Sequence, residues 1–237
     1  MTLLEIEELT WVPEGAERPI WQDVSFHVDS GEMVILKGPS GSGKSTLLKA
    51  IVGLDDISAG RRLFDGEEVT AEIIRRFRNR VVYVHQTPVA IAPLVEQNLA
   101  FPRQIGADLS GDDHEPMTEE EQRQLLEQFG LPDLDWSRRF DALSVGERQR
   151  VAFVRCITVR PELLMLDEPT ASLDPTNAHR IEEFVHHYLE QNPDRSVIWI
   201  THSEKQRHRL DARHIDISQW TPSGESPTEP DEESSTE

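Results

Sequence analysis

The sequence contains one cysteine, Cys156, among its 237 residues, and no apolar run that approaches the length of a membrane span. A single cysteine excludes a disulfide framework within the chain and a zinc site built from several thiolates. A helix that crosses a bilayer needs about 20 consecutive apolar residues. The stretch from Met1 to Glu5 also lacks the basic flank of a secretory signal peptide. These absences predict a cytosolic, globular protein.

Basic residues are scarce as well. The chain has 24 basic residues against 44 acidic ones, which gives a formal net charge of −20, and lysine supplies few of the basic residues. Proteins that bind nucleic acid neutralise its phosphates with a positive surface, so this balance argues against nucleic acid as a partner. Two explanations of the acidic bias stay open. One is a salt-rich cytoplasm, in which a hydrated acidic surface keeps proteins soluble, and the other is codon bias combined with an acidic tail.

The last part of the chain, residues 222–237, differs in composition from the rest. It contains six acidic residues and three prolines, but neither a basic residue nor a large apolar one. Such a segment buries too little apolar surface to offset the entropy lost on ordering. We therefore expect residues 222–237 to be a disordered acidic tail and residues 1–221 to form the folded domain.

Short apolar segments alternate with helical patterns along the folded part. Strands that are apolar throughout are typical of a parallel sheet covered by helices on both faces. Four segments have this composition: Met33–Leu36, Val81–Val84, Leu163–Leu166 and Val197–Ile200. Alternating polarity at Val24–Val28 and the Asp65-Gly66 pair instead indicate a half-buried strand and a hairpin. These patterns predict an antiparallel region near the N-terminus beside a parallel core sheet.

Helical signals dominate between about residues 88 and 158. Thr118 and Glu121 have the spacing of a capping box, and Gly130 ends the apolar pattern that follows. We therefore predict an α/β fold with three parts. These are a mostly parallel core sheet, an N-terminal antiparallel β subdomain, and a helical subdomain inserted at about residues 88–158.

A phosphate-binding motif follows the first of the apolar segments. The sequence from Gly38 to Ser45, GPSGSGKS, matches G-x-x-x-x-G-K-[ST] and precedes a helical pattern. Glycines let backbone N–H groups surround phosphate oxygens, and the helix N-terminus adds the positive end of its dipole. In this motif Lys44 reaches the β- and γ-phosphates, and the Ser45 hydroxyl binds Mg²⁺. The predicted nucleotide-binding residues are Gly38, Pro39, Ser40, Gly41, Ser42, Gly43, Lys44, Ser45 and Thr46.

An acidic pair ends the apolar segment Leu163–Leu166. The carboxyl ends of parallel strands share one edge of a sheet, where a phosphate-binding loop also lies. We therefore predict that Asp167 holds Mg²⁺ through water. Glu168, one residue later, is predicted to orient and deprotonate the attacking water.

A third motif, Leu143-Ser144-Val145-Gly146-Glu147, lies between the phosphate motif and the acidic pair. Ser144 and Glu147 form a capping box, so the segment opens a helix whose N-terminus can face an anion. The segment resembles the LSGGQ signature of ABC-type ATPases, and the resemblance extends from residue 3 to about residue 218. It implies that Ser144, Gly146 and Glu147 contact a nucleotide. Val145 and Glu147 replace a glycine and a glutamine of the family pattern. If the backbone at Val145 needs a left-handed conformation, affinity for that nucleotide drops.

Four further residues match motifs of the same family. Gln86 is similar to the glutamine that touches Mg²⁺ and the attacking water and senses the membrane partner. Asp174, in Ala171-Ser172-Leu173-Asp174, resembles the D-loop aspartate, and His202 resembles the switch histidine. Trp11 stands where the family has an aromatic ring that stacks on adenine. Packing of Trp11 against Trp21 in a small antiparallel sheet is an equal alternative.

The resemblance implies a function as well as a fold. It implies an ATP-hydrolysing subunit that powers an ABC membrane transporter, with ATP and Mg²⁺ sandwiched between two copies in an ATP-dependent homodimer. The partner is an integral membrane permease, which holds the subunit on the cytoplasmic face of the cell membrane. Gln86-Thr87-Pro88, the stretch Asn98–Ile105 and the short C-terminus resemble the Fet/Ybb type, associated with iron export.

Two alternatives to this function stay open. The first is a soluble ABC ATPase that acts on nucleic acid or the ribosome, and the second is the ATPase of a lipoprotein- or lipid-type exporter. The soluble type usually carries coiled coils, zinc modules, a second ATPase domain or a basic surface, and this sequence has none of them. A phosphate-loop kinase would leave the signature, Asp174 and His202 unexplained.

The segment after Gln86, residues 87–95, is apolar and carries prolines at positions 88 and 93. We call it the docking segment. Because prolines limit regular structure, part of this apolar surface is expected to stay exposed for a helix of the membrane partner. We expect Ile91 or Leu94 to be partly exposed, whereas a purely structural role would bury the whole segment.

Overall fold

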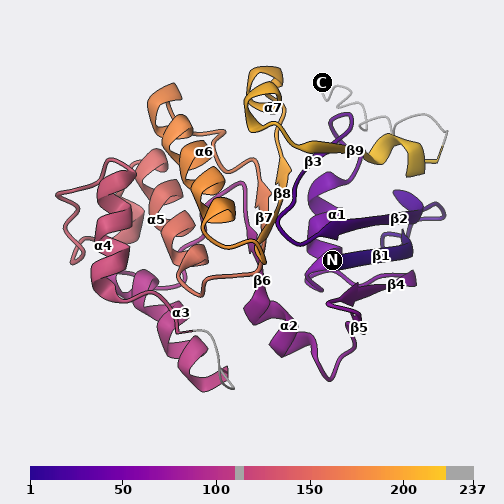
Figure 1. The fold of residues 1–237 in the computed structure, drawn as a ribbon, viewed down its shortest axis with the longest axis horizontal. Helices are drawn as coiled ribbons and strands as arrows, with labels where there is room; N and C mark the ends of the chain where they lie inside the picture. The colour runs from indigo at the N-terminus through magenta and orange to yellow at the C-terminus, as the bar shows by residue number, and fades with distance from the viewer. Residues whose placement is uncertain (110–114, 223–237) are drawn as a thin grey trace, which may run out of the picture.

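Two β-sheets form the framework of the structure, a computed structural model that describes residues 1–109 and 115–222 (Figure 1). The first sheet is antiparallel with strand order β2-β1-β4-β5, and the second is parallel with strand order β6-β7-β8-β3-β9. The antiparallel strands are β1 (Thr2–Trp11), β2 (Trp21–Asp29), β4 (Ala59–Phe64) and β5 (Glu67–Glu68). The parallel strands are β3 (Met33–Lys37), β6 (Val81–Val84), β7 (Leu163–Asp167), β8 (Ser196–Ile200) and β9 (Arg213–Asp216). The predicted parallel core and N-terminal antiparallel region are confirmed.

Helices cover the parallel sheet on both faces, as the continuously apolar strands predicted. Figure 1 shows α1 (Lys44–Ile51) and the antiparallel sheet on one side, and α4, α5 and α6 on the other. The bounds of the other helices are α2 (Ile74–Arg80), α3 (Val95–Leu109), α4 (Glu119–Gln128), α5 (Val145–Ile157), α6 (Pro175–Glu190) and α7 (Glu204–Leu210). Two short 3₁₀ turns, η1 (Phe140–Ala142) and η2 (Ile217–Trp220), complete the elements of the described residues.

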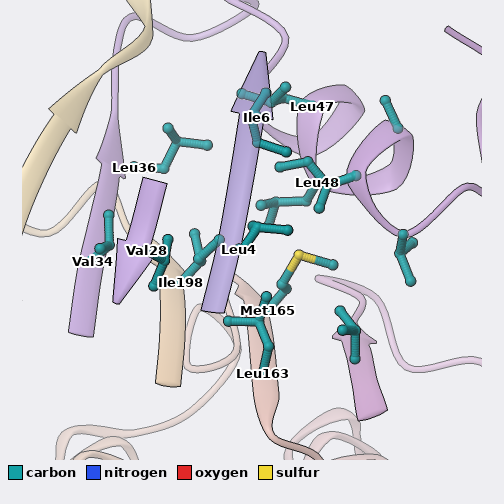
Figure 2. Packing of buried hydrophobic residues seen from close by; sticks show 14 of the residues in the cluster. Leu4, Ile6, Val28, Val34, Leu36, Leu47, Leu48, Leu163, Met165 and Ile198 are labelled. Carbon is teal, nitrogen blue, oxygen red and sulfur yellow. The ribbon is translucent and has the colours of Figure 1, made fainter. Parts of the chain in front are cut away.

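Alternate residues of each central strand enter two separate apolar cores. Val34 and Leu36 of β3 pack with α1 and the antiparallel sheet, whereas Met33 and Ile35 pack with the helices on the opposite face. Figure 2 shows the first core, where Leu47 and Leu48 of α1 lie against strand residues of both sheets. Because successive side chains of a strand point to opposite faces, one strand can anchor both layers. The phosphate motif thus starts from a strand that is fixed on both sides.

The region of helical signals is described as α3, η1, α4 and α5. Thr118 caps α4 with the predicted capping box, in which Thr118 and Glu121 each accept the other's backbone N–H. In the described part of this region the only β-pairing is an isolated bridge between Leu94 and Arg139. The boundaries of the inserted subdomain at 88–158 and of the domain at 1–221 stay predictions. Residues 223–237, nearly all of the predicted acidic tail, lie outside the described part.

None of the helices in the described ranges is both long and apolar enough to cross a membrane.

Candidate active site

Four of the predicted motifs follow four neighbouring strands of the parallel sheet. The phosphate loop, Gly38–Ser45, follows β3, and the acidic pair ends β7. His202 comes two residues after β8, and Gln86 comes two residues after β6. In the register of the sheet, Ile200 of β8 pairs with Leu36 on one side and with Asp167 on the other. The strands are parallel, so all four motifs lie at the same edge of the sheet.

Two glycines give the phosphate loop its shape. Gly41 and Gly43 adopt left-handed backbone angles, with φ of +78° and +83°, which other residues adopt only with strain. Gly43 is also tightly packed, because a Cβ there would lie 2.6 Å from Cγ2 of Ile20 and 2.9 Å from Cδ1 of Trp21. A Cβ on Gly41 would meet nothing within 4 Å. Gly43 therefore anchors the loop on the fold, whereas Gly41 shapes its free part.

Lys44, at the start of α1, is nearly buried, with 6 % of its surface exposed. Its ammonium donates to the carbonyls of Gly38 and Pro39, at 3.0 and 2.7 Å. Burial lowers the pKa of Lys44 below its usual value, and the carboxylates of Glu168 and Asp167 oppose that effect. The ammonium therefore lies inside the loop and interacts electrostatically with the carboxylates of the acidic pair. Ser45 and Thr46, in the same helical turn, are partly buried.

The two carboxylates of the acidic pair have different surroundings. Asp167 is 2 % exposed, and its Oδ2 accepts a hydrogen bond from the Tyr83 hydroxyl at 2.6 Å. Its Oδ1 is buried and has no hydrogen-bond partner among the described residues. Buried charged oxygens are seldom left unpaired, because an unpaired one costs roughly 1–3 kcal/mol or more. The free oxygen of Asp167 therefore fits a cation or a cation-bound water.

Glu168 turns away from the strand and meets His202. Its Oε1 lies 3.1 Å from Nε2 of His202, and both side chains are reached by solvent. The Glu168 backbone is left-handed, with φ of +48°, and its N–H donates to the carbonyl of Ile200 at 3.0 Å. A non-glycine residue in this region is strained, and such strain is concentrated at functional sites. The turn therefore directs the Asp167 carboxylate towards Tyr83 and the Glu168 carboxylate towards His202.

Gln86 and Trp11 lie at the margins of this constellation. Gln86 is exposed in the loop after β6. Trp11 stacks on the buried Trp21, with ring centroids 6.2 Å apart and an angle of 28° between the rings. Packing against Trp21, one of the two alternatives for Trp11, is therefore confirmed. Trp11 as a whole is partly exposed.

The signature segment begins α5, and its capping box is confirmed. The Ser144 hydroxyl accepts the N–H of Glu147, and a Glu147 carboxylate oxygen accepts the N–H of Ser144 at 2.7 Å. These hydrogen bonds keep the pKa of Glu147 below its usual value. Val145 lies in the first turn of α5 and has no left-handed backbone. The loss of glycine at Val145 therefore introduces no backbone strain.

The signature segment borders the loop that contains Asp174. A Cβ on Gly146 would lie 3.5 Å from Cδ2 of Leu173. Asp174 caps α6 by accepting the N–H groups of Thr176 and Asn177, and hydrogen bonds from Asn177 and Thr176 keep its pKa low. Within residues 1–109 and 115–222, no hydrogen bond or ion pair joins the signature segment to the phosphate loop. The site at the sheet edge therefore consists of the phosphate loop, Asp167, Glu168 and His202, without the signature.

The docking segment leaves apolar side chains in contact with solvent. Val89 is 53 % exposed and Ile91 42 % exposed, while Leu94 is partly buried. The predicted partial exposure is confirmed. Phe101, one turn along α3 from the buried Asn98, adds a further apolar side chain that is 42 % exposed.

A buried asparagine holds the docking segment in place. The Asn98 side-chain amide donates to the carbonyls of Ala92 and Leu94, both at 2.7 Å, and its Oδ1 accepts from Arg155 of α5 at 2.9 Å. Arg155 also donates to the carbonyl of Val89 at 2.8 Å. The exposed apolar surface is thus ordered by hydrogen bonds from two helices.

A phosphate loop after β3 and an acidic pair at the end of β7, two strands away in the same parallel sheet, define a phosphate-loop nucleotide hydrolase. Comparison with known proteins gives the family. The family model described as "ABC transporter" matches residues 21–171. The "Probable iron export ATP-binding protein FetA" of Escherichia coli is 35 % identical over 210 residues, which cover 88 % of each chain.

Two further similarities show how widely this sequence pattern is shared. The sulfate/thiosulfate import ATP-binding protein CysA of Bordetella pertussis is 34 % identical over 81 % of this chain, which spans only 53 % of that relative. A solved structure described as an ATP-binding subunit of an ABC transporter superposes with a TM-score of 0.76. It has 28 % identity and covers 91 % of this chain and 85 % of its own.

The chain therefore belongs to the ABC transporter family. It is an ATP-binding subunit of such a transporter and an ATPase.

Sequence reasoning missed two polar side chains at this edge. Tyr83 contacts Asp167, and Asn98 orders the docking segment. The sequence signal in both cases was a polar group among apolar residues. Tyr83 places a hydroxyl inside the apolar strand Val81–Val84, and Asn98 places an amide on the buried face of α3. Buried polar groups need partners, so each predicts a specific contact without naming the partner.

The two left-handed glycines make a testable pair. We expect Gly41→Ala to lower the free energy of unfolding by about 1–2 kcal/mol, the cost of left-handed backbone for alanine. Gly43→Ala should cost about 1–3 kcal/mol more, because its methyl group also overlaps Ile20 and Trp21. Urea unfolding followed by circular dichroism measures both. Equal losses would contradict the packing role of Gly43.

Proposed function

We propose that this chain powers a membrane transporter by binding and hydrolysing ATP with Mg²⁺ at a site that a second copy completes. The observation that carries the proposal is the meeting of the phosphate loop, the acidic pair and His202 at one sheet edge, while the signature lies apart. ATP binding by the phosphate loop rests on the loop backbone and on Lys44. Backbone N–H groups and the N-terminus of α1 attract the phosphates, and the Lys44 ammonium exchanges carbonyl partners for phosphate oxygens.

Three residues are proposed to hold Mg²⁺: Ser45 by its hydroxyl, Asp167 through water, and Gln86 by its side-chain oxygen. The residues fit the ion, since Asp167 has a buried oxygen with no partner in residues 1–109 and 115–222, and oxygen atoms are the ligands that Mg²⁺ prefers. Bound Mg²⁺ would neutralise charge on the phosphate oxygens. Asp167 supplies a carboxyl group in a nearly buried position, and Lys44 supplies the nearby ammonium group.

Glu168 is proposed as the general base. It accepts a proton from the water that attacks the γ-phosphate, and the contact with His202 Nε2 fixes the direction of its carboxylate. The His202 side chain is 49 % exposed, so it is open to a ligand at this edge of the sheet. Gln86, exposed after β6, lies at the boundary between this chemistry and the docking segment. Trp11 is proposed to stack its ring on adenine.

The signature and Asp174 are proposed to act on the nucleotide of a second copy. The Ser144 hydroxyl and the first N–H groups of α5 form a helix N-terminus that suits phosphate oxygens. Ser144, Gly146 and Glu147 have no hydrogen bond or ion pair to their own phosphate loop among the described residues. Two copies placed head to tail would bring each signature to the other's phosphate loop, with Asp174 beside it.

The ordered apolar surface of the docking segment is proposed to receive the permease. Exposed apolar groups in a monomer often mark an interaction site. Here the surface is pre-shaped by Asn98 and Arg155, which reduces the entropy lost on binding. Arg155 belongs to the same helix as the signature, so the docking segment and Ser144 move with one rigid element. Attachment to the permease would hold the subunit on the cytoplasmic face of the membrane.

We propose that the transported substrate is iron and that the direction of transport is export. The exporter relative and the sulfate importer are equally similar in identity, at 35 % and 34 %, so identity does not separate them. This chain spans 88 % of the exporter relative and 53 % of the importer. The stretches Gln86-Thr87-Pro88 and Asn98–Ile105, which resemble the Fet/Ybb type, support the exporter type.

Glu168→Gln tests the assignment of the base. The variant should bind ATP with normal affinity but hydrolyse it about 10²–10⁴-fold more slowly, because the amide keeps the shape and loses the basicity. Phosphate release measures the rate, and fluorescence of a labelled nucleotide measures binding. Lys44→Ala is the contrasting variant, since it should lose ATP binding itself. Hydrolysis by Glu168→Gln at a rate near that of the wild type would remove Glu168 from the role.

Ile91→Asp tests the docking surface. A charge there should abolish membrane association while ATP hydrolysis by the purified subunit stays unchanged, because Ile91 is remote from the phosphate loop along the chain and exposed. Leu54→Asp is the matched control, because Leu54 is 51 % exposed and follows α1 instead. High-speed sedimentation of lysates measures the membrane-bound fraction of each variant. If Ile91→Asp and Leu54→Asp stay equally membrane-bound, the permease docks elsewhere.

A further inference from the structure

Tyr83 places a hydroxyl group in the buried interior beside the acidic pair. It is one of the two tyrosines of the chain and lies in β6, next to β7. The parallel register pairs Tyr83 with Met165, two residues before Asp167. Its ring is nearly buried, and the ring of His85 packs against it edge-on with centroids 4.4 Å apart. The side chain is thus held from both ends, by His85 at the ring and by Asp167 at the hydroxyl.

The hydrogen bond between the two side chains has the geometry of a strong one. Tyr83 Oη donates to Oδ2 of Asp167 at 2.6 Å, within the range for a hydroxyl bonded to a charged oxygen. The Tyr83 hydroxyl is the donor in this hydrogen bond, and the Asp167 carboxylate oxygen is the acceptor.

The hydrogen bond from Tyr83 to Oδ2 determines which oxygen of Asp167, namely Oδ1, stays available to a ligand. With Oδ2 bonded to Tyr83, rotation of the carboxylate would break a buried hydrogen bond, so the orientation is fixed. Among the residues that the structure describes, Oδ1 is then the oxygen left without a partner, in a position that is nearly buried. A fixed, unpartnered carboxylate oxygen is what a cation or its bound water requires.

We propose that Tyr83 is a positioning residue for the magnesium site: its hydroxyl holds Asp167 so that Oδ1 faces the metal side. This inference rests on the proposed role of Asp167. Tyr83 itself contacts neither nucleotide nor metal, and it acts through the aspartate. Partners that orient metal-binding residues commonly contribute 10–100-fold to metal affinity.

Tyr83→Phe removes the hydroxyl and keeps the ring. We expect this full-length variant, loaded with the non-hydrolysable analogue AMP-PNP, to bind Mn²⁺ about 10–100-fold more weakly than the wild type. Electron paramagnetic resonance of free Mn²⁺ measures that affinity. The affinity for AMP-PNP in EDTA should stay unchanged, because the phosphate loop keeps its contacts.

Tyr188→Phe is the matched control. Tyr188, of α6, is also buried and donates its hydroxyl to a backbone carbonyl, that of Pro161. This variant should bind Mn²⁺ as the wild type does. Wild-type Mn²⁺ affinity in Tyr83→Phe, or an equal loss in both variants, would overturn the inference and leave Asp167 as the proposed ligand. A wild-type protein that binds no Mn²⁺ in the presence of AMP-PNP would overturn the metal role of Asp167 together with the inference.

A second measurement does not require Tyr83→Phe to fold. In Tyr188→Phe the remaining tyrosine is Tyr83, so a protein labelled with [¹³Cζ]tyrosine gives one tyrosine resonance. Addition of Mg²⁺ to the AMP-PNP complex should shift it, because a cation at Asp167 withdraws charge from the oxygen that accepts the Tyr83 hydrogen bond. A resonance that does not move when Mg²⁺ saturates the complex would contradict the proposed link.

Discussion

The parallel register of β6, β7, β8 and β3 is the constraint on which the site depends. Because these strands run in the same direction and lie side by side, the loops that leave them meet at one edge. Segments that are far apart in the sequence, from Gly38 to His202, thereby become neighbours. The same strands send alternate side chains into two cores, so the edge is held from both faces. A shift of one residue in any strand would exchange its two core faces and misplace its functional loop.

Charge at this edge is arranged so that the site is incomplete by itself. Lys44 donates hydrogen bonds to carbonyls of its own loop, and Asp167 has one oxygen without a partner in the described part of the chain. Buried charges of this kind reduce stability unless they are paired. A nucleotide with its metal ion would supply both missing partners at once. The signature helix presents an N-terminus that Ser144 and Glu147 cap locally, and within residues 1–109 and 115–222 no hydrogen bond or ion pair joins it to the phosphate loop.

The sequence was informative where function depends on local chemistry. The phosphate loop, the acidic pair and the capping boxes of α4 and α5 could be predicted because each is set by a few adjacent residues. The bond between Tyr83 and Asp167 could not, because it depends on the pairing of strands that are 84 positions apart. The contact of Asn98 with Arg155 was hidden because it depends on the packing of α3 against α5. The effect of Val145 on nucleotide affinity depended on its backbone angles. These are known only from the structure, in which Val145 lies in the first turn of α5.

The central claim is that two copies share the nucleotides, since one chain keeps its signature and its phosphate loop apart. Sedimentation velocity of full-length Glu168→Gln, with and without ATP and Mg²⁺, tests it most directly. The acidic surface of the free subunit opposes association, and bound nucleotide should join phosphate loop to signature across the interface. The account predicts a monomer without nucleotide and a dimer with it. A monomer under both conditions, or a tight dimer that forms equally without ATP, would contradict the account.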